Sequence, residues 1–234
     1  MRALQSPPTR VEQVYDEILA AITDGKLPPH TRLIQDDLAS QLGVSRQPVQ
    51  QALLLLRNDG LARDAPGRGL IVAPFDAEAA RNVYEVRAAL EGLASRLAAE
   101  RGSARAAGAR AAVIENGRAA VASGSVSRMV AADLKFHNLI YELSGNTLIK
   151  ETAEPHWRQM RRTMGEVLML DDTPSRIWTE HEAILSAVIA GDAAKAEDLG
   201  RCHISDAAEG LLAKIYSKEM PQPDTQQGRI GRRA

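Results

Sequence analysis

Apolar residues recur every three or four positions along most of the chain, which is the spacing of one face of an α-helix. The first apolar stripe consists of Val11, Val14, Ile18, Leu19 and Ile22. Thr9 precedes this stripe and Glu12 follows three positions later, which is the spacing of a capping box. A short helix is expected next in IQDDLASQLG, and a longer one from Arg46 to about Asp59.

The pattern changes after that third helix. LARDAPGRGLIVAP contains two short runs of β-prone residues on either side of PGRG, which predicts a β-hairpin. The second and third helices are separated only by a tight LGVS turn. Three helices followed by a hairpin are the outline of a winged helix-turn-helix. We therefore expect such a domain over residues 10–75, after an N-terminal extension of residues 1–9.

Helical spacing without any strand pattern continues over residues 76–217. Breaks rich in Gly, Ser, Asp or Pro divide this region into segments at about 77–101, 104–122, 127–143, 147–169, 175–190 and 193–217. Pro155 should kink the fourth segment. These segments predict an antiparallel bundle of about six helices, so the fold class is mainly α. The tail, residues 218–234, has no apolar period and is expected to be disordered.

Composition agrees with a helical, globular protein. Hydrophobic residues make up 44% and aromatic residues only 3%, so the core must be built mostly from Ala, Leu, Val and Ile. The net charge of −1 provides no overall basic field, so nucleic-acid binding would have to rest on a local patch. The single cysteine, Cys202, rules out an internal disulfide framework. With no signal peptide and no membrane-length apolar run, we expect a cytoplasmic protein without a membrane partner.

A polar stripe lies along the helix predicted to begin at Arg46. At about 100° per residue, the core face of this helix consists of Val49, Ala52, Leu53 and Leu56. The neighbouring stripe consists of Arg46, Gln47, Gln50 and Arg57. Gln is suited to adenine, and Arg to guanine or phosphate, while Arg68 at the hairpin tip could reach phosphate or the minor groove. The alternative reading is an ordinary solvated helix face, because four polar residues alone do not establish DNA binding.

The stretch DDLASQLGVSRQPVQQALLLLRNDGLARDAPGRGLIVAP resembles the DNA-binding domain of the GntR family of bacterial transcription regulators. That family shows L-A-x-x-L-G-V-S-R-x-P-V-R-E-A-L, then G-L, then a Gly-Arg-Gly wing. The resemblance implies DNA contacts from Ser45, Arg46, Gln47, Arg68 and Gly69. Gln50 and Gln51 stand where the family usually has Arg and Glu, so we expect Gln50 to read an operator that depends less on guanine. Leu54 and Leu55 replace residues that are commonly basic, and they suit another domain or subunit better than DNA.

A second candidate site lies in the helical half of the chain. Asp133 and His137 are four residues apart in DLKFH, so they project from the same face of a helix. His181 lies beside the apolar stripe of WTEHEAIL, and His203 lies in the last helix. Each histidine alone is more often an ordinary core residue, and the Asp–His pair alone does not distinguish a ligand pair from a helix surface. One Asp and three His from three helices are, however, a donor set suited to Zn, Ni or Mn.

The stretches YEVRAALEGLASRLAA, DLKFHNLIYELSGNTLI and TEHEAILSAVIAGDAAKAEDL resemble the FCD effector domain found in the FadR-like branch of the same family. In many FCD domains an Asp and three His bind a divalent metal that faces an effector pocket. The resemblance implies this role for Asp133, His137, His181 and His203. Arg87 falls on the apolar stripe of its helix, where its guanidinium either pairs internally with Glu91 or Asp133 or binds a carboxylate effector. Asn138 is a further candidate for effector binding.

These features predict a ligand-responsive transcription regulator, expected to act as a repressor, that binds a divalent metal and a small organic acid. A palindromic operator on double-stranded DNA needs two recognition helices, so we expect a homodimer. The alternative is a metal-dependent hydrolase or lyase with a centre of three His and one Asp and an accessory DNA-binding domain. An enzyme of that kind needs a general acid or base near the metal. The sequence places no Glu recognisably beside these ligands, so we expect no enzyme.

Overall fold

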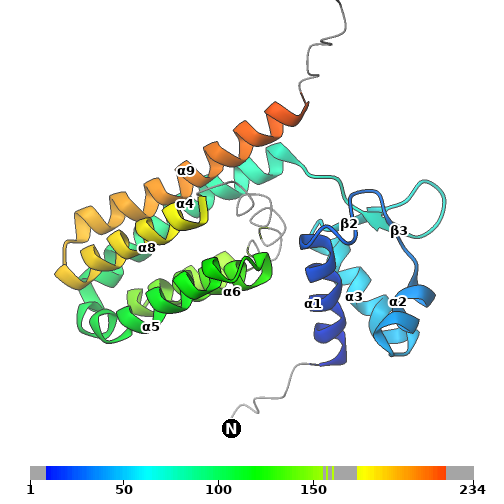
Figure 1. The fold of residues 1–234 in the computed structure, drawn as a ribbon, viewed down its shortest axis with the longest axis horizontal. Helices are drawn as coiled ribbons and strands as arrows, with labels where there is room; N and C mark the ends of the chain where they lie inside the picture. The colour runs from blue at the N-terminus through cyan, green and yellow to red at the C-terminus, as the bar shows by residue number, and fades with distance from the viewer. Residues whose placement is uncertain (1–8, 155–156, 158–159, 161–172, 220–234) are drawn as a thin grey trace, which may run out of the picture.

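Two helical regions joined by a short extended segment make up the protein (Figure 1). The structure is a computed structural model, and it describes residues 9–154, 157, 160 and 173–219. The kink expected at Pro155 and most of the tail expected from residue 218 onward lie outside the described residues. The predicted fold class, a mainly α protein with a winged helix-turn-helix ahead of a helical bundle, is confirmed.

The N-terminal region begins with the capping box that the sequence predicts. The backbone N–H of Glu12 donates to Oγ1 of Thr9 at 3.2 Å, and the backbone N–H of Thr9 donates to Oε2 of Glu12 at 2.6 Å. These bonds satisfy two of the amides that a helix leaves without partners at its start. Helix α1 (Arg10–Thr23) follows, and then α2 (Gln35–Leu42) and α3 (Arg46–Asn58).

Helix α3 has the core face that its periodicity predicts. Its buried residues are Val49, Ala52, Leu53 and Leu56. Leu54 and Leu55 are 43% and 36% exposed, in agreement with their positions off that face. The apolar contacts of α3 with α1 and α2 form the small core of this region, and they leave the polar stripe of α3 open to solvent.

The predicted hairpin is formed by β2 (Ala62–Asp64) and β3 (Leu70–Val72), which pair antiparallel. A further strand, β1 (Arg32–Leu33), pairs with the other edge of β3, so the sheet has the order β1-β3-β2. The sequence pattern did not predict β1, because two residues are too few to show an alternation. At the hairpin tip, Gly67 and Gly69 have φ values of 95° and 90°, a backbone region that favours glycine.

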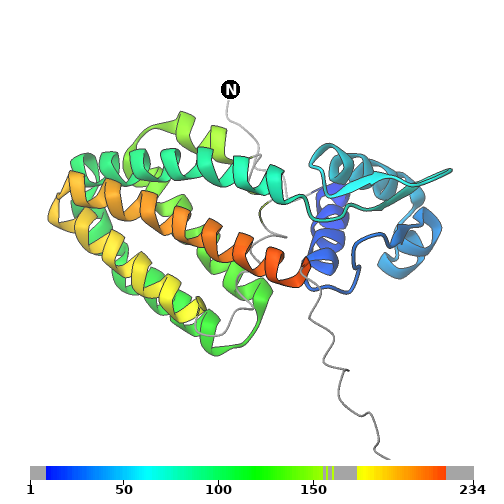
Figure 2. The same cartoon turned by 90° about the horizontal axis from the view of Figure 1, so that it is seen from above.

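The C-terminal region is a bundle whose helices agree closely with five of the predicted segments, while most of the sixth, 147–169, lies outside the described residues. It contains α4 (Ala77–Arg101), α5 (Ser103–Ala122), α6 (Val126–Ser144), α8 (Thr173–Ala190) and α9 (Ala193–Glu219). Helices α4 and α9 run side by side, with α8 next to α9 (Figure 2), while α5 and α6 pack against α8 and α4. Within the described part of the chain, no helix is both long and apolar enough to cross a membrane.

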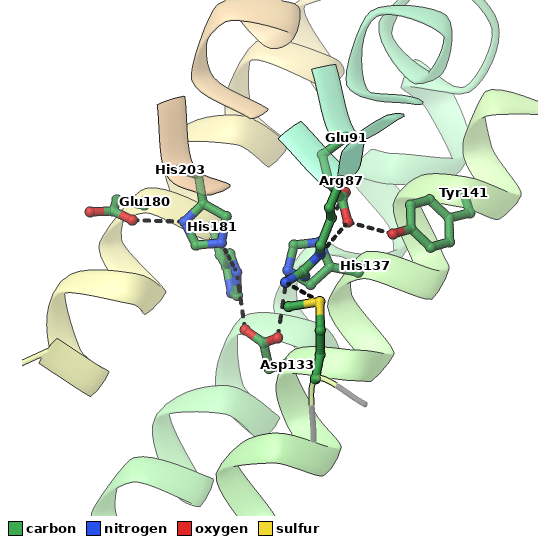
Figure 3. Close-up of polar contacts among 9 residues, drawn as sticks. Arg87, Glu91, Asp133, His137, Tyr141, Glu180, His181 and His203 are labelled. Carbon is green, nitrogen blue, oxygen red and sulfur yellow. Dashed lines mark hydrogen bonds and ion pairs between the residues drawn. The ribbon is translucent and has the colours of Figure 1, made fainter. Parts of the chain in front are cut away.

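The interior of this bundle is apolar apart from one set of polar side chains. The buried polar and charged residues are Arg87, Glu91, Ser95, Asp133, His137, Ser144, His181 and His203. Burying such groups is unfavourable unless they are hydrogen-bonded, paired or bound to a metal. Most of them gather where α4, α6, α8 and α9 meet, which marks this place as the candidate site (Figure 3).

Candidate metal centre and DNA-binding face

Four of the predicted side chains meet in the middle of the bundle (Figure 3). Asp133 and His137 come from α6, His181 from α8 and His203 from α9. Their potential ligand atoms all lie within 4.8 Å of one another. The structure therefore brings together the Asp and the three His that the sequence selected from three separate helices.

The spacing of these atoms suits a small divalent cation. Two donor atoms that each lie about 2.1 Å from a metal, at angles near 90° to 110°, are separated by about 3.0 to 3.4 Å. Nε2 of His181 lies 3.1 Å from Nε2 of His203 and 3.4 Å from Oδ1 of Asp133. Nε2 of His137 lies 3.6 Å from Oδ2 of Asp133. The residues present thus fit a metal such as Zn, Ni or Mn.

The protonation of the imidazoles also suits metal binding, because a metal needs the lone pair of a neutral ring. Burial lowers the pKa of His181 well below its ordinary value, and the neighbouring His203 and His137 lower it further. Burial also lowers the pKa of His137, although the carboxylate of Glu91 opposes this shift. Both rings are consequently neutral at pH 7.

Two glutamates hold the far sides of two of these rings. Nδ1 of His137 lies 3.0 Å from Oε2 of Glu91, and Nδ1 of His203 lies 2.7 Å from Oε2 of Glu180. A carboxylate at Nδ1 favours the tautomer that carries its proton there, which leaves the Nε2 lone pair directed at the centre. Sequence reasoning considered Glu91 only as a partner of Arg87 and did not select Glu180. No spacing signal links Glu180 to His203, because the two residues lie on different helices.

Arg87 points into the bundle, as predicted, and it is paired there. Its Nε lies 3.3 Å from Oε1 of Glu91, and its Cζ lies 4.0 Å from the ring centroid of Trp157. Nη1 is 3.7 Å from Sδ of Met160. The internal partner is therefore Glu91 rather than Asp133. Nη2 is buried and has no hydrogen-bond partner among the described residues, so one edge of the guanidinium could still donate a hydrogen bond to a ligand.

The carboxylate of Glu91 stays ionised in this buried position. Burial by itself opposes ionisation, but the contacts of Glu91 with His137 and with the charged Arg87 outweigh it and hold the pKa of Glu91 below its ordinary value. The hydroxyl of Tyr141 also donates a hydrogen bond to Oε1 of Glu91. The pKa of Arg87 is raised, because the effect of Glu91 and its neighbours exceeds that of burial, so the guanidinium remains charged.

Aromatic rings pack around the centre on its other sides. The ring of Phe136 stacks on that of His181 with centroids 3.8 Å apart, and Trp178 meets His181 edge-on at 4.8 Å. Asn138, the second predicted effector residue, is half-buried on α6 next to His137. It is not among the residues whose polar contacts form the cluster in Figure 3. A small pocket beside Arg87 has room for about one water molecule and is lined by Arg87, Leu90, Ala153, Trp157 and Met160.

The predicted DNA-binding residues are all exposed on the winged domain; they are Ser45, Arg46, Gln47, Gln50, Arg68 and Gly69. Arg46, Arg68 and Gly69 line one hollow between α3 and the hairpin tip, together with Arg32 and Asp36. Ser45 occupies the N-cap position of α3, but its side chain makes no capping bond. Because the hydroxyl is not used in that way, it is available to another partner.

Two side chains that sequence reasoning missed hold this DNA-binding face. The guanidinium of Arg32 donates to the backbone carbonyls of Arg68 at 3.1 Å and of Pro66 at 3.3 Å, which ties the hairpin tip to β1. Asp36 of α2 lies 2.5 Å from Nε of Arg46 and so orients the first arginine of α3. Neither contact is readable from periodicity, because each joins segments that only the folded sheet and turn bring together.

A winged helix-turn-helix with an exposed arginine and glutamine stripe, joined to a helical domain with an internal polar centre, is the architecture of a ligand-responsive DNA-binding regulator. Comparison with known families agrees. Residues 10–72 match the family described as "Bacterial regulatory proteins, gntR family", and residues 82–206 match the FCD domain. The chain belongs to the GntR family of transcriptional regulators and carries an FCD domain.

Individual relatives are transcriptional regulators as well. LutR of Bacillus subtilis is 29% identical over 221 residues, which cover 85% of this chain and 99% of LutR. A regulator encoded in the TAR-I ttuE-ttuC' intergenic region of Agrobacterium vitis is 41% identical over 90 residues, which cover 38% of this chain and 53% of that relative. The chain thus spans about half the length of the Agrobacterium protein. The solved structure of Escherichia coli McbR/YncC has the same fold, with a TM-score of 0.70 at 23% identity over 91% of this chain and 99% of that chain.

Proposed function

We propose that this regulator is a homodimeric, cytoplasmic repressor whose DNA binding responds to a small carboxylate bound beside a divalent metal. In this proposal residues 10–75 bind a palindromic operator on double-stranded DNA, and residues 76–217 sense the ligand. The observation that carries the proposal is the convergence of four buried donors with the spacing of a metal site, together with the buried Arg87, which Glu91 connects to His137 and whose Nη2 has no hydrogen-bond partner among the described residues. The family supports the DNA-binding part directly.

The metal would be held by Asp133, His137, His181 and His203. Three neutral imidazoles and one carboxylate suit Zn, Ni or Mn, and the outer contacts from Glu91 and Glu180 keep two of the rings oriented. When bound, the cation supplies a positive charge and open coordination positions that attract an anion in an otherwise apolar bundle.

Arg87 binds the carboxylate group of the organic ligand in this proposal. Its Nη2 is buried and has no hydrogen-bond partner in the part of the chain that the structure describes, and a buried N–H of a charged group gains most from a carboxylate. The indole of Trp157 covers the guanidinium, which restricts the orientation of an incoming anion. Asn138 is a further candidate contact on α6. The small pocket beside Arg87 implies that a ligand larger than water requires a shift of the neighbouring side chains.

On the DNA side, the beginning of α3 supplies phosphate and base contacts. The hydroxyl of Ser45 and the free amides of the first turn suit a phosphate, since helix N-termini attract anions. Arg46, Gln47 and Gln50 are exposed on the stripe expected to meet base edges. Arg68 and Gly69 at the hairpin tip lie where close backbone approach is possible.

The enzyme alternative gains no support from the two glutamates near the centre. Glu91 and Glu180 contact the Nδ1 atoms of His137 and His203, on the side of each ring that faces away from the converging Nε2 atoms. Neither carboxylate therefore faces the place where a metal-bound water would be activated. The family and the named relatives are regulators rather than enzymes.

The metal site is tested with the double variant His181→Ala/His203→Ala, purified as the full chain and assayed for bound metal by elemental analysis. We expect about one divalent ion per chain in the unchanged protein and none in the variant. His30→Asn is the matched control, because His30 is exposed on the winged domain and Asn tolerates its φ of 70°. Full metal content in the double variant would refute the site.

The ligand is tested by a thermal-shift screen of small carboxylates, with and without a chelator. A carboxylate that needs the metal should raise the melting temperature only in the metal-loaded protein. The same compound should change the affinity for operator DNA in a fluorescence anisotropy titration. A stabilising carboxylate whose effect survives both chelation and Arg87→Met would place its binding site elsewhere in the protein.

A further inference from the structure

The carboxylate of Glu91 contacts both Arg87, the proposed anion-binding residue, and His137, a proposed metal ligand. Its Oε1 accepts from Nε of Arg87 at 3.3 Å and from the hydroxyl of Tyr141, while its Oε2 lies 3.0 Å from Nδ1 of His137 (Figure 3). The side chain of Glu91 is 3% exposed. A buried carboxylate with these contacts has both oxygens in use, so it cannot change one contact without affecting the other.

A second glutamate, Glu180, also contacts a proposed metal ligand and an arginine, but that arginine is not a proposed anion-binding residue. Glu180 contacts Nδ1 of His203 at 2.7 Å and pairs with Arg176, four residues earlier on the same helix, at 3.0 Å. Glu91 likewise pairs with Arg87, four residues earlier on α4. The difference lies in exposure, since the side chain of Arg176 is 49% exposed and that of Arg87 only 7%.

We propose that Glu91 is a positioning residue that couples the anion-binding guanidinium of Arg87 to the metal ligand His137. This proposal rests on the metal and carboxylate sites of the proposed function. Glu91 holds the imidazole so that Nε2 faces the centre, and it holds Arg87 by Nε, which leaves Nη2 without a partner among the described residues and open to the anion. Glu180 positions His203 alone, because its arginine partner is solvated and its charge is screened.

The coupling has a definite sign. In the free protein the negative charge of Glu91 is shared between His137 and the guanidinium of Arg87. An anion that binds Nη2 neutralises the guanidinium, so more of the carboxylate charge acts on the imidazole and strengthens it as a metal donor. Carboxylate and metal should therefore strengthen each other's binding, and by linkage the effect is equal in both directions.

The test uses zinc alone as the probe, titrated into the metal-free full-length protein in competition with a chromophoric chelator. Glu91→Gln keeps the side-chain shape but removes the charge, and we expect zinc affinity to fall by about 10- to 100-fold. Glu180→Gln should weaken zinc binding by a similar factor. With cobalt as the probe, each variant should also change the visible absorption spectrum, which reports ligand geometry and not merely stability.

The coupling is isolated by adding Arg87→Met to each background. In the protein with Glu91, removal of the guanidinium should tighten zinc binding, because the carboxylate is then no longer shared. In the Glu91→Gln background the gain in zinc affinity from Arg87→Met should be smaller by a factor of about three or more. Coupling of that size is usual for two contacting residues in a double-mutant cycle. The control pair, Arg176→Met with Glu180→Gln, should be additive.

The outcomes separate this proposal from the proposed function. Absence of zinc binding by the unchanged protein would overturn both. Zinc binding by folded Glu91→Gln that equals that of the unchanged protein would overturn the positioning role while leaving the metal site standing. An equal gain from Arg87→Met in both backgrounds would overturn the coupling. If circular dichroism shows that Glu91→Gln does not fold, Glu91→Asp, which keeps the charge but is too short to hold both partners, takes its place with the same expected loss.

Discussion

Gly117 of α5 packs directly against the indole of Trp178 on α8. A Cβ placed on Gly117 would lie 2.2 Å from three ring carbons, whereas real Cβ atoms essentially never approach closer than 3.0 Å. The indole is 4% exposed and cannot simply rotate out of the way. It also meets His181 edge-on, with ring centroids 4.8 Å apart. Gly117→Ala should therefore disturb both the α5–α8 contact and the neighbouring metal ligand.

The size of this effect follows from two opposing terms. Overpacking a core by one methyl group costs about 1 to 3 kcal/mol, and the short contact with a rigid ring places Gly117→Ala near the upper end. Alanine gains about 1 kcal/mol over glycine within a helix. The net destabilisation is then about 2 kcal/mol, which corresponds to a fall of about 4 to 8 °C in the melting temperature of a chain of this size.

Gly108 provides the control, since it lies in the same helix and an added Cβ would meet nothing within 4 Å. Gly108→Ala should raise the melting temperature by about 2 to 4 °C, from helix propensity alone. Both variants are measured by calorimetry on the metal-free protein and by zinc titration, where only Gly117→Ala should bind more weakly. A Gly117→Ala protein that melts at or above the temperature of the unchanged chain would show that the α5–α8 contact is looser than described.

The remaining predictions concern pH and DNA. Burial lowers the pKa of His181 in the folded protein, so below about pH 6.5 the unfolded chain takes up a proton at this residue and the folded chain does not. The metal-free protein should therefore lose stability as the pH falls below about 6.5, and the loss should be less steep in His181→Gln. Denaturation curves of the two proteins at several pH values check this. Gln50→Ala should weaken operator binding at particular base pairs without changing its salt dependence; an equal loss on random DNA would contradict base reading. Arg68→Ala should lower the salt slope by about one. Arg32→Ala, which frees the hairpin tip from β1, should weaken binding to all sequences alike; anisotropy titrations at several salt concentrations measure all three.

The sequence predicted those parts of the fold whose causes are local: a repeating pattern of buried residues, a helix cap or a turn. The core face of α3 follows from four apolar positions on one side of a helix, and the start of α1 follows from Thr9 and Glu12, whose capping bonds are local. The hairpin follows from glycines that the tip requires at positive φ. In each case the physical cause lies within a few residues of sequence, so the sequence alone is sufficient.

Contacts between elements were predictable only where residue chemistry is rare. A buried Asp and three buried His stand out against an apolar bundle, and they met as expected. Glutamates do not stand out, because most of them are solvated on helix surfaces. The contacts of Glu91 with His137 and of Glu180 with His203 depend on how far α4 and α8 are shifted along α6 and α9. That shift is set by side-chain packing, which periodicity does not specify.

The position of Glu91 and Arg87 on α4 bears on how a signal could reach the DNA. Only residues 73–76 separate β3 of the winged domain from the start of α4, which Asp76 caps through a 2.9 Å bond to the amide of Ala79. The helix that carries Arg87, the proposed anion-binding residue, is thus the one joined directly to β3 of the winged domain. A ligand biases an equilibrium only through differential contacts with two states. A shift of α4 along α9, with which it packs side by side, would change the contacts at Arg87 and the placement of β3 together. Because no other helix carries both a ligand contact and this connection within the described residues, we expect ligand-dependent movement of the winged domain to begin in α4.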